Sequence, residues 1–152
     1  MSIAQIAGMK TKALAVGQGI FYIFSGLWPI VHYRSFEKVT GPKTDDWLVK
    51  TTGGLIAMAG LSILRAGLRS DLNQDLNESS NAPHEAAIVG AGHAFVLGTS
   101  AGYYSLIGRI SKVYLFDAVT EYALVGAWLL TTLKPTSTAP KIESKEGLTY
   151  AA

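Results

Sequence analysis

Four apolar stretches, each close to the length of a membrane-crossing helix, constrain this chain more than any other feature of its sequence. They cover residues 13–32, 47–68, 85–107 and 113–133. A bilayer core needs about 20 apolar residues in a helix, because lipid leaves no water to bond exposed backbone groups. Charged residues make up 16% of the chain, whereas soluble domains contain about 25%. The sequence therefore predicts an all-α fold, namely an integral membrane four-helix bundle.

The connections between these stretches set the predicted topology. Residues 108–112 are so few that the third and fourth spans must form an antiparallel hairpin. A polar link after residue 32 joins the first two spans into a second antiparallel hairpin, and residues 69–84 connect the pairs. Residues 1–12 form a predicted polar segment and 134–152 a predicted disordered tail. Because the first stretch is long and lacks a small-residue cleavage site, we interpret it as an uncleaved span rather than a signal peptide.

The distribution of charge slightly favours one orientation of the chain in the membrane, and the composition excludes several protein classes. Both termini are predicted on one side of the membrane, and Lys10 and Lys12 before the first span favour the cytoplasmic side. Zero cysteines exclude a disulfide scaffold, and a net charge of +2 without a basic block excludes a nucleic-acid binder. Motifs for zinc, haem, serine hydrolysis and phosphate loops do not occur, so no metal or cofactor is predicted.

Polar residues within the first span indicate which of its faces lies in the interior. Five of them follow steps of three and four residues and so share one helix face: Gln18, Tyr22, Ser25, Pro29 and His32. The opposite face carries bulky apolar residues such as Phe24. Since polar groups at membrane depth cost free energy unless they contact other helices, we expect the polar face to be interior.

An acidic pair in the last span is the strongest pointer to a site. Asp117 and Glu121 are four residues apart and share a helix face. His32, Arg34 and Lys50 are predicted at the same end of the bundle. One interpretation is a structural ion-pair network in which Arg34 or Lys50 neutralises an acid. The alternatives are a water-accessible cavity that binds an ion, head group or proton, and side chains that merely reach the interface.

The third span carries small residues at every fourth position, including Gly90, Ala94, Gly98 and Gly102. Small residues allow close backbone approach, either within this chain or across a homodimer. His93 lies beside that stripe, and we interpret it as a histidine hydrogen-bonded to a neighbouring helix. A haem or metal ligand would need a partner histidine at matching depth.

The segment HYRSFEKVTGPKTDDWLVKTTGG, residues 32–54, has the character of a family signature. Together with the helix count, the chain length, glycine-rich spans and an acidic last span, this segment makes the chain resemble the small four-span inner-membrane proteins of bacteria, of which the DoxX-like proteins are the broad example. The resemblance implies a helical bundle in a bacterial inner membrane. It implies no activity.

These observations predict a small multi-pass membrane protein with a non-enzymatic binding, transport-associated or accessory role. Its partners would be the lipid bilayer and, as further alternatives, a homodimer through the third span or a larger membrane complex. The alternative function is a membrane-embedded enzyme that acts on a lipid-soluble substrate. In that enzyme Asp117 or Glu121 would be the acid or base, assisted by His93 or Tyr104.

Overall fold

The computed structural model describes residues 3–75 and 82–132, and within them the side chains of 8–69 and 85–132. In these ranges the chain forms five α-helices and no strand, which confirms the prediction of an all-α fold. The helices are α1 (Ile3–Val31), α2 (Tyr33–Thr40), α3 (Asp46–Asp75), α4 (Ala82–Leu106) and α5 (Tyr114–Thr132). The predicted tail lies outside the described residues.

Four of these helices coincide with the four apolar stretches, and two extend well beyond them. Helix α1 begins ten residues before residue 13, and α3 continues seven residues past residue 68. Residues 3–12 are rich in alanine, lysine, glutamine and methionine, which favour helix regardless of hydropathy. The apolar stretches therefore predicted where the four long helices lie but not where each helix begins and ends.

Helix α2 occupies part of the link that the sequence predicted only as polar. It begins after His32, whose Nδ1 accepts a hydrogen bond from the Ser35 backbone N–H at 3.3 Å. It ends at Gly41, whose φ of +87° is a conformation that favours glycine. Arg34 and Lys38 lie one turn apart on one side of α2, and Phe36 and the buried Thr40 lie on the other. This short helix is therefore amphipathic.

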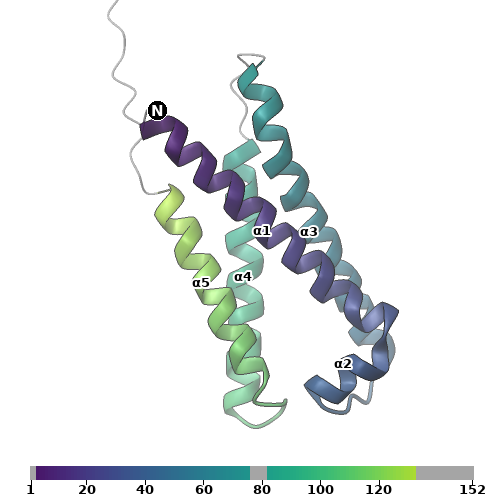
Figure 1. Cartoon of the computed structure of the whole chain (residues 1–152). Helices are drawn as coiled ribbons and strands as arrows, with labels where there is room; N and C mark the ends of the chain where they lie inside the picture. The colour runs from purple at the N-terminus through teal and green to yellow at the C-terminus, as the bar shows by residue number, and fades with distance from the viewer. Residues whose placement is uncertain (1–2, 76–81, 133–152) are drawn as a thin grey trace, which may run out of the picture.

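The helices associate as two antiparallel pairs, α1 with α3 and α4 with α5 (Figure 1). The start of α1 and the end of α5 lie at one end of the bundle. Helix α2 and the loop between α4 and α5 lie at the other end (Figure 1). Contacts between α3 and α4, and between α1 and α5, join the two pairs.

Glycines set the close approach of α1 to α3. A Cβ atom added at Gly19 would lie 2.7 Å from the backbone nitrogen of Leu64, and one added at Gly60 would lie 2.7 Å from the carbonyl oxygen of Gly19. Gly26 and Gly53 face each other in the same way, two helical turns further along the pair. The glycines are seven residues apart on each helix, so they form one seam along the pair.

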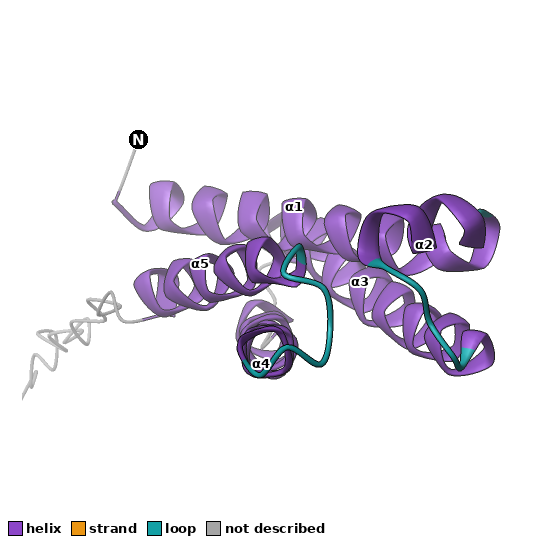
Figure 2. Ribbon diagram, turned by 90° about the horizontal axis from the view of Figure 1, so that it is seen from below, coloured by secondary structure: helices purple, strands orange, loops and turns teal. Residues whose placement is uncertain are grey.

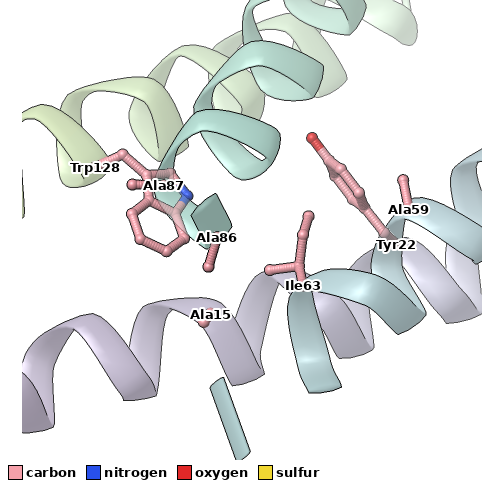
Figure 3. Packing of buried hydrophobic residues seen from close by; sticks show 7 residues of the cluster. All are labelled: Ala15, Tyr22, Ala59, Ile63, Ala86, Ala87 and Trp128. Atoms are coloured by element: carbon pink, nitrogen blue, oxygen red, sulfur yellow. The ribbon is translucent and has the colours of Figure 1, made fainter. Parts of the chain in front are cut away.

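A small cluster of buried residues joins all four long helices (Figure 3). It contains alanines from α1, α3 and α4 together with three larger side chains, Tyr22, Ile63 and Trp128. Figure 3 shows Trp128 beside Ala87 and Tyr22 beside Ala59. The alanines leave the space that the large side chains fill.

The outer surface of the bundle is rich in large apolar side chains, and several polar side chains are buried in its interior. The largest fully buried side chains include Gln18, Glu121 and Ser105. Large apolar side chains are exposed on every long helix, with Phe24 72% and Phe116 83% exposed. Monomeric soluble proteins rarely leave contiguous apolar surface of this extent in water.

Two helices contain a stretch that is long and apolar enough to cross a membrane. These stretches are Gly8–Val31 of α1 and Asp46–Arg69 of α3, with mean hydropathies of 1.5 and 1.4. The core helix of a soluble protein can have the same length and hydropathy, but it is mostly buried. Here only 33% and 22% of the most apolar 18 residues of the two stretches are buried within the chain.

Candidate functional site

The interior of the bundle holds two hydrogen-bonded groups of polar side chains. In the first, Gln18 of α1 bridges the other helix pair. Its Nε2 donates to the carbonyl oxygen of Gly90 at 2.9 Å, and its Oε1 accepts from the indole Nε1 of Trp128 at 2.6 Å. Gln18 and Trp128 are 2% and 1% exposed. Both ends of the Gln18 amide are therefore satisfied without water.

The second group joins α1 to α5. The hydroxyl of Tyr22 donates to Oε2 of Glu121 at 2.6 Å, and both side chains are buried. A buried hydrogen bond between two such groups is strong because no water competes for it. Because Gln18 and Tyr22 are one turn apart on α1, the two groups lie next to each other in the interior.

Helical spacing and one glycine place these side chains. Glu121 and Trp128 are seven residues apart on α5 and share its inward face. Gly90 of α4 leaves room for the side chains of Trp128 and Gln18, since an added Cβ would lie 2.6 Å from Nε1 of Trp128 and 2.8 Å from Oε1 of Gln18. Glycine at this position thus permits the Gln18 bridge.

The predicted interior face of α1 is confirmed over most of its length. Gln18, Tyr22 and Pro29 are buried and Ser25 is half-buried. His32 is exposed, because α1 ends beside it and its ring caps α2. The bulky residues of the opposite face are exposed, as expected.

The structure does not bring the predicted charge cluster together. In the described part of the chain, no ion pair joins Arg34 or Lys50 to Asp117 or Glu121. Nζ of Lys50 lies 2.9 Å from Oδ2 of Asp46, one turn earlier on α3, and 5.1 Å from the ring centre of Tyr33. Glu121 is bonded to Tyr22 instead. Arg34 and Lys50 lie near the ends of α2 and α3, whereas Glu121 is buried further inside the bundle.

Asp117 occupies an intermediate position, one turn from Glu121 towards the α4–α5 loop. Its side chain is half-buried. It lies on the same helix as Tyr114, whose ring centre is 5.2 Å from Nζ of Lys43. Asp117 therefore lies between the sealed interior and the end of the bundle.

The other residues considered for catalysis point away from Glu121. His93 is exposed, and its Nδ1 lies 3.0 Å from the carbonyl oxygen of Val89 in its own helix. The expected hydrogen bond to a neighbouring helix is thus replaced by one within α4. Tyr104 is 44% exposed, and its ring packs edge-on against Tyr103.

The small-residue stripe of α4 packs within the chain. Gly98 faces Glu121, whose Cβ would be 3.0 Å from an added Cβ, and Gly102 faces Ala118. Ala94 is fully buried. Of the two interpretations of this stripe, the geometry matches intrachain packing.

Loops at the α2 end contact each other and enclose one lysine. Nζ of Lys43 donates to the carbonyl oxygens of Thr40 and Gly41 at 2.8 and 3.1 Å. Partial burial lowers the pKa of Lys43, and the negative charge of Glu37 opposes that shift. An added Cβ at Gly41 would be 3.8 Å from Cβ of Ser111 in the α4–α5 loop. Lys43 thereby connects the end of α2 to the start of α5.

Within the described residues, no group of three or more histidine, aspartate or glutamate side chains is arranged to hold a metal ion. Comparison with protein-family models, with curated protein sequences and with solved structures finds no match.

Proposed function

We propose that the protein is a multi-pass integral membrane protein in which α1, α3, α4 and α5 cross the bilayer, and that it acts as a non-enzymatic binding or accessory subunit. The observation that carries the proposal is the exposure of large apolar side chains on all four long helices, together with polar side chains bonded to each other in the interior. Apolar side chains cover the outside of all four helices, while Gln18, Tyr22 and Glu121 are satisfied inside. Lipid is the solvent in which that distribution has low free energy.

The closed state of the interior supports a non-enzymatic role. Catalysis by an acid and its assistants requires them to converge on an accessible cavity. Glu121 is 1% exposed, whereas His93 and Tyr104 lie on outer surfaces of α4. The polar interior therefore fixes how the helices pack. A partner or ligand would bind at the ends or on the outer faces of the bundle. The DoxX-like resemblance, the bacterial inner membrane and the homodimer stay predictions.

Carbonate washing tests membrane integration. We expect the full chain to stay in the membrane pellet and to be released only by detergent. Recovery in the carbonate supernatant would contradict the proposal.

Single-cysteine labelling tests the number of spans, and the chain offers a clean background because it contains no cysteine. We would place cysteine at Met9, Lys38, Glu85 or Lys112, all outside the hydrogen-bonded interior, and label sealed vesicles with an impermeant maleimide. Four spans place Lys112→Cys on the same side as Lys38→Cys and opposite Met9→Cys and Glu85→Cys. If only α1 and α3 cross, Lys112→Cys labels from the side of Met9→Cys.

A further inference from the structure

The α2 end of the bundle carries more basic than acidic side chains, and most of the basic ones have no ion pair in the described chain. Residues 32–50 and 107–113 together contain six cations and three acids. Asp46 is paired with Lys50, and Oε1 of Glu37 accepts the backbone N–H of Lys43. Five of the six cations have no ion pair in the described residues. Lys43 is half-buried and donates to two backbone carbonyls. The other four are exposed: Arg34, Lys38, Arg109 and Lys112.

These cations come from two segments that lie at the same end of the molecule. Arg34 and Lys38 share the outer side of α2, and Arg109 and Lys112 belong to the α4–α5 loop. Figure 2, which views the bundle from this end, shows α2 over the end of the α1–α3 pair and the loop over that of the α4–α5 pair. The two segments are neighbours, because Nζ of Lys43 lies 5.2 Å from the ring centre of Tyr114 and a Cβ added at Gly41 would lie 3.8 Å from Cβ of Ser111.

Two exposed tryptophans and an exposed valine lie at the same end of the bundle as the cations. The indole Nε1 of Trp28 donates to Oγ of Ser35 at 2.7 Å, which ties the end of α1 to α2, and its ring packs edge-on against Phe36. Trp47 at the start of α3 is 65% exposed, and Val39 on α2 is also exposed. Tryptophan beside basic residues is typical of side chains at the head-group level of a membrane.

We propose that α2 and the α4–α5 loop form a docking surface for the head groups of anionic lipids, with Arg34 and Lys38 as the main contacts. This inference rests on the proposed membrane location. Charge complementarity selects the occupant: unpaired cations attract lipid phosphates, while the exposed tryptophans and valine contact the first methylene groups of the acyl chains. A guanidinium and an ammonium one helical turn apart can both reach a single layer of phosphates.

Tryptophan quenching by brominated lipids tests this surface with a built-in reporter. Of the three tryptophans, Trp28 and Trp47 are exposed at the α2 end, and Trp128 is buried at a distance from it. The full chain would be reconstituted in bilayers with dibrominated phosphatidylglycerol or dibrominated phosphatidylcholine, in varied proportion. The relative quenching gives the preference for the anionic lipid. The variant is Arg34→Gln/Lys38→Gln, and the matched control is Lys10→Gln/Arg69→Gln, which removes two exposed cations at the opposite end.

We expect a preference for phosphatidylglycerol that falls about fivefold or more in the α2 variant, and that high salt also weakens. The control should retain the preference. Equal quenching by the two lipids in the wild type, or an unchanged preference in the α2 variant, overturns the docking surface and leaves the membrane location standing. Quenching by neither lipid overturns the membrane location itself. Thermal unfolding in detergent confirms that each variant is folded.

Discussion

Replacing Gly90 with alanine tests the polar interior most directly. The structure places the new Cβ 2.6 Å from Nε1 of Trp128 and 2.8 Å from Oε1 of Gln18. Ordinary carbon contacts are about 3.5–4.0 Å, so the indole or the amide must move by about 1 Å. Either movement lengthens a hydrogen bond that joins α1 to the α4–α5 pair.

The magnitude combines three effects. Overpacking a tight site costs about 1–3 kcal/mol, and losing one buried hydrogen bond costs about 1–3 kcal/mol. Alanine stabilises a helix interior by about 1 kcal/mol relative to glycine. The net expectation is a free energy of unfolding lower by about 3 kcal/mol in Gly90→Ala.

Gly92 supplies the control in the same helix, because an added Cβ there meets nothing within 4 Å. Gly92→Ala should therefore show only the helix-propensity gain, up to about 1 kcal/mol. Unfolding with sodium dodecyl sulfate in dodecyl maltoside micelles, followed by far-ultraviolet circular dichroism, measures both variants. If Gly90→Ala is as stable as Gly92→Ala, the described contact of Gln18 and Trp128 with α4 is refuted.

Of three further predictions, the first two use the same unfolding assay and the third uses thermal unfolding in the same detergent. Tyr22→Phe should lower the free energy of unfolding by about 1–3 kcal/mol, because it leaves the buried carboxyl group of Glu121 without its hydrogen-bond donor. The control Tyr122→Phe removes an exposed hydroxyl and should change the free energy of unfolding by less than about 0.5 kcal/mol. Equal effects of the two substitutions would contradict the buried hydrogen bond. Gly60→Ala should destabilise the α1–α3 pair by about 1–3 kcal/mol and Gly54→Ala should not, since an added Cβ meets backbone at the first position and only the tip of a side chain at the second. Burial lowers the pKa of Lys43 from its ordinary 10.5, so the folded state binds the Lys43 proton less readily than the unfolded state. Raising the pH towards 10.5 should therefore stabilise the wild type relative to Lys43→Gln. A difference in melting temperature between the two proteins that stays constant from mildly to strongly alkaline pH would contradict this.

The helices and the inward face of α1 could be predicted from the sequence because both depend on residue spacing. Apolar runs and steps of three and four residues are local properties. The same holds for the small-residue stripe of α4. Helix α2 was missed because eight residues with charged and apolar side chains give no apolar run, although steps of three and four are present.

Partners across helices were harder to predict. Charge alone suggested Lys50 with Glu121, but Lys50 finds Asp46 within its own helix, at a lower entropic cost. The hydrogen bond between Gln18 and Trp128 could have been predicted from the positions of these residues along their predicted spans. Gln18 and Gly90 each lie five residues from the start of their predicted spans, and Trp128 five from the end of its span, all near one surface. Matching buried polar groups by depth would have brought these three together.

The Gln18 bridge also bears on the order in which the protein is assembled. Gln18 and Tyr22 belong to the first helix made, but Gly90 follows Gln18 by 72 residues, Glu121 follows Tyr22 by 99, and Trp128 follows Gln18 by 110. At about 5–20 residues per second of synthesis, α1 waits about 5–20 s for its last partner. During that interval the Gln18 amide and the Tyr22 hydroxyl lack their final hydrogen-bond partners and, in the proposed membrane location, also lack water. The α1–α3 pair can close early along its glycine seam. The polar face of α1 obtains its last two partners, Glu121 and Trp128, only after α5 has been made.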